Sequence, residues 1–479
     1  MVPTQSFRYW HRSVNRNVSL DMADIPAVSF RGSDRGERLF AQHIRQGELA
    51  RQHAVNVIML VYLVTVFDGV LRKYIMPEYS RELLFIRDPI VMYLYIHALR
   101  HRLIAQSAFL STGIVLFVIA VVIVLVQLNY ITIDPIFVVY GFRQYFSLLP
   151  LPFIMANVLR RADINRFIRM NLVISILMAP LMVLQVTLPP DSWINVGLGQ
   201  KNVFEQVFYG QFARAAGFFT SAGGAAPFLH INGAIIILLW MTPKADRPCS
   251  DMLFWLGMIA EIISISVSGN RFAIVGVVLI GITAMISPFL MPIGNAAGLR
   301  GMTGPLVVGG LALTIAVFLF PDQFEAIRER WSEANENQGW FAIVDRAIDS
   351  AGEFYHVLLR TSFFGDGLGI GTNAQMIASS DLSLLAAGVE NDWSRHIVDL
   401  GSFGGILYIA YRVGLVGHLM MIGIVQARRF SDPTALMFFA AAGHLIFYGT
   451  VTGQSTTNGF AWFFVGLILA APNYAKSFR

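Results

Sequence analysis

The stretch IVLFVIAVVIVLV (Ile114–Val126) decides the fold of this chain, because none of its side chains is charged or polar. It belongs to an apolar run over 103–127, long enough to cross a hydrocarbon core that needs about 20 helical residues. A run of this length in lipid satisfies its backbone hydrogen bonds only as a helix. The sequence therefore predicts a membrane-spanning helix here, and similar runs lie on both sides of it.

The composition of the whole chain agrees with that prediction. Of its 479 residues, 55% are hydrophobic and 14% are charged, and the mean hydropathy is +0.59. Soluble domains carry about 25% charged residues, which excludes a water-soluble fold. We expect an all-α polytopic membrane protein of about twelve transmembrane helices. They lie near 54–70, 83–99, 103–127, 134–157, 167–188, 224–242, 251–268, 272–290, 304–320, 399–425, 434–454 and 457–472.

One long polar segment, residues 321–398, interrupts these runs between the ninth and tenth spans. We expect a helical extracytoplasmic loop there that carries the chemistry. The remaining regions are a cytoplasmic N-terminal segment over 1–53, spans one to nine over 54–320, and spans ten to twelve with a cytoplasmic tail over 399–479.

Arginine placement predicts the orientation. The leader before the first span and alternate short loops are rich in arginine, and such loops stay in the cytoplasm. Both termini are therefore expected to be cytoplasmic. The leader is too long and too polar for a secretory signal peptide.

Motif searches exclude several classes of function. Cys249 is the single cysteine, and there is no Cys/His cluster with zinc spacing, no phosphate loop ending in Lys-Ser/Thr and no basic–aromatic patch. We expect no metal, no cofactor and no nucleic-acid partner. The inside-positive loops account for the pI near 9.3.

Two arginines are predicted at the outer membrane surface. Arg214 lies in ARAAGFFTSAGG just before a span, and Arg271 follows SVSGN at the end of another. Guanidinium groups bind phosphate bidentately and keep their charge, so the pair suits an anionic lipid-anchored ligand. Simple anchoring to lipid headgroups is the alternative.

Other charged residues have more than one interpretation. Arg346 lies in the amphipathic stretch WFAIVDRAIDS. One interpretation is that it binds diphosphate or a sugar, and the other is that it belongs to a solvated helix face. Arg143, within the fourth span, is a candidate diphosphate ligand that lines a cavity, or it forms an ion pair. Several further charges near or inside spans are interpreted as helix–helix ion pairs or snorkelling end residues. These are Asp68, Arg87, Asp88, Glu261 and Arg412.

The order of these elements resembles the bacterial O-antigen ligase and polysaccharide polymerase superfamily, which uses polyprenyl-diphosphate-linked glycans. Arg214 with AAGFF resembles the family's Arg-x-x-Gly-x-Phe, and Ser268-Gly-Asn-Arg271 resembles its Ser-Arg. TSFFGDGLGIG (Thr361–Gly371) resembles its glycine pattern. ENDWSRHIVDLGSFGG (Glu390–Gly405) resembles the entry to its tenth span. The matching positions in that last stretch are Asn391, Trp393, Asp399, Gly401 and Gly404.

The resemblance implies a metal-independent, inverting glycosyl transfer. Arginines hold the lipid diphosphate, and a base takes the proton of the acceptor hydroxyl. Ligases of this group place a histidine where this chain has Glu390, and Glu390 is the first candidate base. His396 is the rival, because on a helix Asp392, His396 and Asp399 share a face and an aspartate could orient the imidazole. Asp366 and a purely structural loop are further alternatives.

Glycines are expected to shape the loop next to this base. Gly365, Gly367 and Gly369 allow either a close backbone approach to substrate or a flexible turn, and Asn391 follows Glu390.

Together these features predict a polymerase at the periplasmic face of a bacterial inner membrane. It joins undecaprenyl-diphosphate-linked oligosaccharide repeats, which serve as donor and acceptor, into exopolysaccharide, capsule or O-antigen. A chain-length regulator and a flippase are candidate partner proteins. The alternatives are an O-antigen ligase that uses a lipid A-core or other acceptor, a precursor transporter or flippase, and a non-catalytic assembly subunit. The transporter ranks lower because we find no repeated halves and expect the polar residues at the outer surface rather than at mid-membrane.

Overall fold

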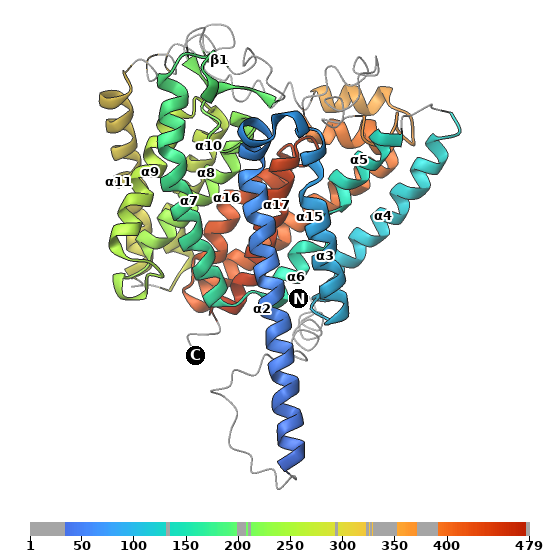
Figure 1. The fold of residues 1–479 in the computed structure, drawn as a ribbon, viewed down its shortest axis with the longest axis horizontal. Coiled ribbons are helices and arrows are strands. Elements are labelled where there is room, and N and C mark those ends of the chain that lie inside the picture. The colour runs from blue at the N-terminus through green and yellow to red at the C-terminus, as the bar shows by residue number, and fades with distance from the viewer. Residues whose placement is uncertain are drawn as a thin grey trace. The chain divides into compact units, whose positions relative to one another are not determined.

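The protein is helical, as expected from its sequence (Figure 1). The computed structural model describes residues 34–130, 135–198, 207–208, 212–292, 296–321, 325, 328, 352–370 and 391–475. The longer helices are α2 (Asp34–Val70), α3 (Arg87–Arg100), α4 (Ala108–Gln127), α5 (Pro135–Phe146), α6 (Leu151–Val158), α7 (Arg161–Thr187), α8 (Ala222–Met241), α9 (Asp251–Val267), α10 (Arg271–Leu290), α11 (Ala296–Leu319), α15 (Asp392–Phe430), α16 (Thr434–Tyr448) and α17 (Ser455–Ala475).

Short elements join these helices. A π-helical turn, η2 (Leu71–Ile75), extends α2, and the 3-10 turns η3 (Pro77–Tyr79) and η4 (Glu82–Phe85) lead to α3. Two further 3-10 turns are η5 (Trp193–Asn195) and η8 (Lys244–Asp246). Strands β1 (Val207–Phe208) and β2 (Phe212–Ala213) pair antiparallel.

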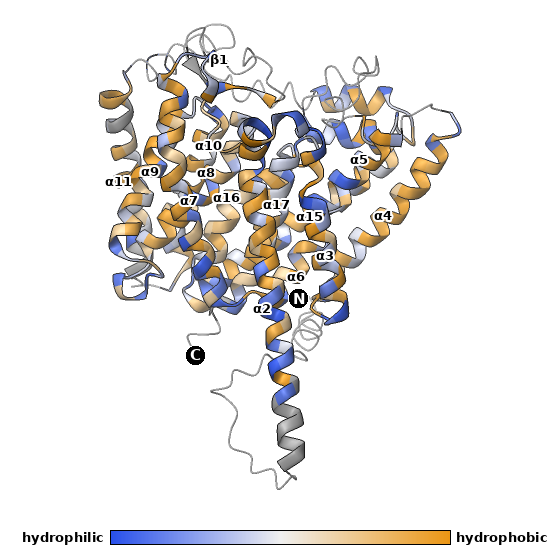
Figure 2. Ribbon diagram, in the orientation of Figure 1, coloured by the Kyte–Doolittle hydropathy of each residue, from blue (hydrophilic) through white to orange (hydrophobic). Residues whose placement is uncertain are grey.

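The chain divides into two units, Met1–Ala50 and Arg51–Arg479. In the first unit the structure describes only the beginning of α2. The second unit holds all the other elements. In Figure 2 its helices are apolar along most of their length, and polar residues gather near helix ends.

Seven helices of the described residues are long and apolar enough to cross a membrane. They are Ile44–Ile75, α4, α7, α8, Arg300–Leu319, α10 and α15. Each of the twelve expected segments contains helix, but α3, α9 and α16 fall short of the required length. A multi-pass membrane protein is therefore supported, while the count of twelve spans and the orientation of the termini stay predictions.

The expected fourth span is two helices rather than one. Helix α5 ends at Phe146, and α6 begins at Leu151. Pro150 and Pro152 stand at the start of α6, where no intrahelical hydrogen bond needs their missing amide hydrogens. Within one continuous helix, the same two prolines would remove backbone hydrogen bonds and break it. The sequence prediction overlooked this break.

Helix α8 is the centre of the second unit. Nearly all of its residues are buried, and it packs on α7, α9, α10, α11, α16 and α17. By contrast, α4, α10 and α11 expose most of their apolar side chains, as lipid-facing helices do.

Five helices begin at one end of this unit, which we call the Ser455 end. The Ala222 carbonyl, at the start of α8, accepts a hydrogen bond of 2.8 Å from the Asn270 side chain. Asn270 is the residue that caps α10. A Cβ on Gly224 would lie 3.5 Å from Thr456 in α17. The α17 residue Ser455 contacts the first residue of α3, and the first residue of α15 contacts the loop before α17.

Asparagine and serine side chains define these starts. Ser221 accepts from an amide of α8, Asn270 from α10, and Asn391 from α15. Each satisfies a backbone donor that would otherwise be unpaired in the first turn.

Candidate functional site

Two predicted site residues of the loop lie outside the described part of the chain. These are Glu390 and Arg346. Their proposed roles as acceptor base and diphosphate ligand therefore stay predictions. Asn391 is described, and its side chain caps α15 by accepting from the Ser394 amide at 2.8 Å. Helix α15 thus begins at Asp392, before the expected start of the tenth span at residue 399.

The glycine-rich segment makes close backbone contacts within the protein. Gly365, Gly367 and Gly369 have φ of 85°, 134° and 93°, a region that favours glycine. A Cβ on Gly365 would lie 2.5 Å from the Gly401 nitrogen, where α15 departs from helical geometry. The segment packs against the chain's own backbone, and its close approach to a substrate stays a prediction.

A side chain of α4 and the backbone of α15 hold the same segment. Gln127 donates to the carbonyls of Phe364 and Asp399 at 2.6 and 2.9 Å and accepts from the Leu368 amide at 3.1 Å. The Asp366 amide donates to Val398 at 2.7 Å. Burial raises the pKa of Asp366, so its carboxyl holds a proton to higher pH than a solvated aspartate.

Gly369→Ala is expected to destabilise the protein. The new Cβ would meet the Phe137 carbonyl oxygen at 2.0 Å, and the positive φ alone costs about 1–2 kcal/mol for a non-glycine residue. The measurement is the thermal unfolding midpoint of the detergent-purified chain. Gly309→Ala is the matched control, because a Cβ there meets nothing within 4 Å. Equal midpoints for both variants would contradict the close packing.

His396 lies in a fully buried polar network on α15. Its Nε2 lies 2.7 Å from the Arg412 guanidinium, and its Nδ1 lies 2.9 Å from the Tyr145 hydroxyl. Because arginine only donates, Nε2 accepts and the hydrogen sits on Nδ1. Tyr145 in turn donates to Asp399 at 3.0 Å. Both ring nitrogens of His396 are therefore engaged within the protein.

Asp392 is the anionic centre of this network. Its carboxylate pairs with Arg412 and lies 3.8 Å from His396 Nε2, in keeping with the shared helix face that the spacing predicts. It also accepts from the Val451 amide at 3.1 Å and the Thr452 hydroxyl at 2.8 Å. The network thereby anchors the loop that ends at Ser455.

The two surface arginines of the sequence prediction lie at the Ser455 end. Arg271 is the first residue of α10, directly after its cap. Arg214 follows β2, and its buried Nε has no hydrogen-bond partner among the described residues. The chain just after it is held by the end of α7, where Gln185 accepts from the amides of Ala216 and Gly217 at 3.0 and 2.8 Å.

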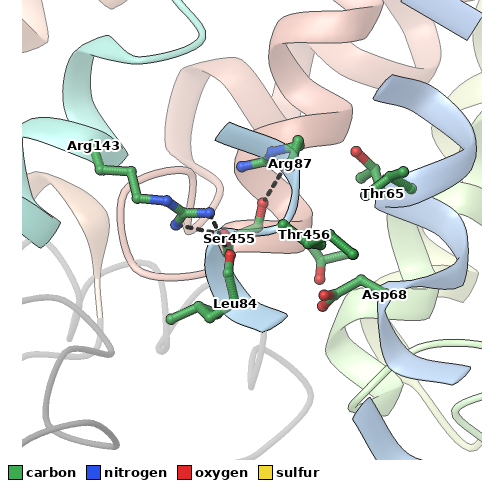
Figure 3. Close-up of a pocket in the computed structure, with 9 residues that line it drawn as sticks. Thr65, Asp68, Leu84, Arg87, Arg143, Ser455 and Thr456 are labelled. Carbon is green, nitrogen blue, oxygen red and sulfur yellow. Dashed lines mark hydrogen bonds between the residues drawn. The ribbon is translucent and has the colours of Figure 1, made fainter. Parts of the chain in front are cut away.

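A small pocket, open to solvent, lies at the same end, beside Ser455 (Figure 3). Its polar lining comes from four helices: α2, α3, α5 and α17. The residues are Thr65, Asp68, Arg87, Arg143, Ser455 and Thr456.

Arg143 both lines this pocket and forms an ion pair, so the two interpretations left open by the sequence are both realised. Its Nε donates to Asp88 at 2.5 Å, Nη1 to the Ser455 hydroxyl at 2.9 Å and Nη2 to the Leu84 carbonyl at 2.8 Å. All three nitrogens are thus used within the protein.

Arg87 is different. Its Nη1 donates to the Ser455 carbonyl at 3.2 Å, but its Nε is buried without a hydrogen-bond partner among the described residues. The side chain is 5% exposed. Asp68, on the far wall of the pocket, pairs with Arg72 at 3.1 Å. Sequence reasoning noticed Arg87 and Asp68 as charges near spans but assigned them no function.

The pocket is electropositive. Asp88 neutralises Arg143 and Arg72 neutralises Asp68, which leaves Arg87 without a carboxylate within 4 Å among the described residues. The N-termini of α3 and α17 add partial positive charge at the same place. Such an arrangement suits an anion.

Neither the protein-family models nor the curated protein sequences gave a match to this chain.

Proposed function

We propose that this protein is a membrane glycosyltransferase that joins undecaprenyl-diphosphate-linked oligosaccharide repeats into exopolysaccharide, capsule or O-antigen. The acceptor hydroxyl oxygen attacks the anomeric carbon of the donor. The bond from that carbon to the diphosphate oxygen breaks, and the lipid diphosphate leaves with the electron pair. Glu390 takes the hydroxyl proton, with His396 as the alternative.

The observation that carries the proposal is the gathering of arginines at the Ser455 end, of which Arg87 and Arg143 are buried. Arg87 and Arg143 line a pocket there, and Arg271 begins α10 at the same end. Guanidinium groups in a low-dielectric setting bind phosphate oxygens strongly. The occupied nitrogens of His396 favour Glu390 as the base.

A buried polar cluster favours the transporter as the second candidate. Glu261, 1% exposed, accepts from Asn232 at 2.7 Å near the middle of α9 and α8. Asn232 accepts from Asn171, which accepts from Tyr62. Polar groups are thus present deep in the bundle as well as at its ends, contrary to the expectation from sequence. Buried carboxyl groups in membranes commonly mark ion or proton sites.

Carrier-linked glycans in a null strain test the proposal. Loss of a polymerase is expected to leave single repeats on the lipid carrier at the outer face, because assembly stops before the first joining step. Mass analysis of the extracted carrier lipids measures their length. Long carrier-linked chains would indicate a ligase, and single repeats confined to the cytoplasmic face would indicate a transporter.

A further inference from the structure

The segment 215–219 directly follows Arg214 and lies inside the protein. Ala215 and Phe219 in it are 0% and 1% exposed. We propose that Gln185, in the last turn of α7, is a positioning residue that fixes this segment and thereby places Arg214. Its importance for the reaction rests on the proposed function, whereas the placement of Arg214 does not.

Gln185 contacts the segment through both polar atoms of its side-chain amide. Its Oε1 accepts from the backbone amides of Ala216 and Gly217 at 3.0 and 2.8 Å. Its Nε2 donates to the Gly217 carbonyl at 3.3 Å. Because two N–H groups point at the same atom, that atom is the oxygen, which determines the orientation of the amide. One side chain thus satisfies three backbone groups in a turn outside any helix or strand.

The protein also holds Gln185 itself in place. Its Nε2 lies 3.2 Å from the Tyr74 hydroxyl, and that hydroxyl donates to the Ile194 carbonyl at 2.6 Å. The backbone carbonyl of Gln185 accepts from the Asn195 side chain at 2.9 Å. Gln185 is 2% exposed. A buried side chain with partners at both polar atoms keeps one conformation, as a residue that supports a site requires.

The segment is also packed tightly between two helices. A Cβ on Gly69 of α2 would lie 2.2 Å from the Phe218 carbonyl oxygen. Gly217 has a φ of 56°, and a Cβ on it would lie 2.7 Å from the Met178 side chain of α7. Both glycines therefore allow a close backbone approach. Gln185 supplies the polar contacts of the segment on the α7 side.

The position of Arg214 depends on the backbone around it. Its buried Nε has no hydrogen-bond partner among the described residues. Strand β2 ends at the preceding residue and pairs with β1, and Gln185 holds the second and third residues after Arg214. A guanidinium binds an anion bidentately only when its planar fork is aligned, so the support of its backbone matters.

Hydrogen–deuterium exchange of the detergent-purified full chain measures the contact directly. Gln185→Met has a similar length but no amide oxygen. We expect the Ala216 and Gly217 amides to exchange about tenfold faster in it, because both lose a hydrogen bond. Gln185→Glu keeps an oxygen at the same reach and should retain slow exchange. Equal exchange in Gln185→Met and the wild type would overturn the proposal.

Two further variants and a reference peptide separate a local effect from a general one. Gln185→Asn shortens the side chain by one methylene group and should speed the same two amides. Thr187→Val removes an exposed hydroxyl that donates only within α7, and it should exchange like the wild type. Peptides from the interior of α8 should be unchanged in all variants. An equal acceleration there would show that Gln185 stabilises the fold as a whole, and it would reject the positioning role.

A nitroxide spin label at position 214 tests whether the segment controls that residue. Arg214 is partly exposed, and Cys249→Ala removes the single native thiol, so Arg214→Cys is labelled selectively. We expect Gln185→Met to narrow the electron paramagnetic resonance spectrum, because the label gains mobility. Gln185→Glu and Thr187→Val should leave the spectrum of the labelled parent unchanged. An unchanged spectrum in Gln185→Met would overturn the link to Arg214.

Polymer output in a null strain tests the part that rests on the proposed function. We expect Gln185→Met to lower polymer about tenfold or more at normal membrane abundance, because a misplaced group loses its productive geometry. Gln185→Glu should restore most of it. Faster exchange and a mobile label together with wild-type polymer would keep the placement of Arg214 and remove that residue from the proposed reaction. Unchanged exchange would reject the inference whatever glycans the null strain accumulates.

Discussion

Arg412→Gln is expected to lower the free energy of unfolding by about 3–5 kcal/mol, the range for breaking a buried ion pair from one side. Arg412 is 2% exposed and its partner Asp392 is fully buried. The substitution leaves a carboxylate in the interior without its cation. It also removes donors from His396 Nε2 at 2.7 Å and from the Ile446 carbonyl at 2.8 Å.

Loss of the Arg412 guanidinium would also release the loop before α17. Arg412 donates to the Gly449 carbonyl at 3.1 Å, and Asp392 holds Thr452 from the other side. That loop carries Ser455 into the pocket, where it contacts Arg87 and Arg143. We therefore expect the lining of this pocket to be displaced as stability falls.

Thermal and denaturant unfolding of the purified chain measure the effect. The double variant Asp392→Asn, Arg412→Gln should recover part of the loss, because removing both charges avoids the unpaired carboxylate. Lys244→Gln is the control for a solvent-facing pair, since the side chains of Lys244 and its partner Asp251 are 73% and 48% exposed, and it should change little. A midpoint for Arg412→Gln that equals this control would refute the buried network as a stabilising element.

Helix positions were predictable because lipid imposes a strong rule on sequence. A run such as Ile114–Val126 has one stable conformation in a membrane. The caps at Ser221 and Asn270 follow from residue type and position. The break between α5 and α6 was missed because apolar residues continue on both sides of it, so hydropathy gave no sign of it. Pro150 and Pro152 were the available signal.

Local spacing also predicted part of the polar network. Asp392, His396 and Asp399 share a face at steps of four and three, and they do converge on one site. Tyr145 could not be added from sequence, because it lies 251 residues from His396. Its hydroxyl is what links the imidazole to Asp399.

The pocket shows the limit of reasoning along the chain. Arg143 is compensated by Asp88, 55 residues away, and Arg87 contacts Ser455, 368 residues away. Which arginine keeps a free donor depends on these long-range partners. Sequence alone ranked Arg143 as a diphosphate ligand, which stays a prediction, and assigned no function to Arg87.

Arg271→Lys is expected to abolish most polymer at normal protein levels. Lysine keeps the positive charge, but it presents a point charge instead of two parallel donors to a diphosphate. Arg271 opens α10 directly after its Asn270 cap, where the helix dipole also favours an anion. The effect should therefore concern substrate binding rather than folding.

The test uses a null strain that expresses the variant. It measures polymer output, the length of carrier-linked glycans and the abundance of the protein in the membrane. Arg429→Lys is the matched control, because Arg429 is exposed at the far end of α15 and the same exchange there should leave polymer unchanged. We expect Arg271→Lys to accumulate single repeats, as the null strain does. Wild-type polymer from this variant would show that a guanidinium fork at the start of α10 is not needed to hold the donor diphosphate.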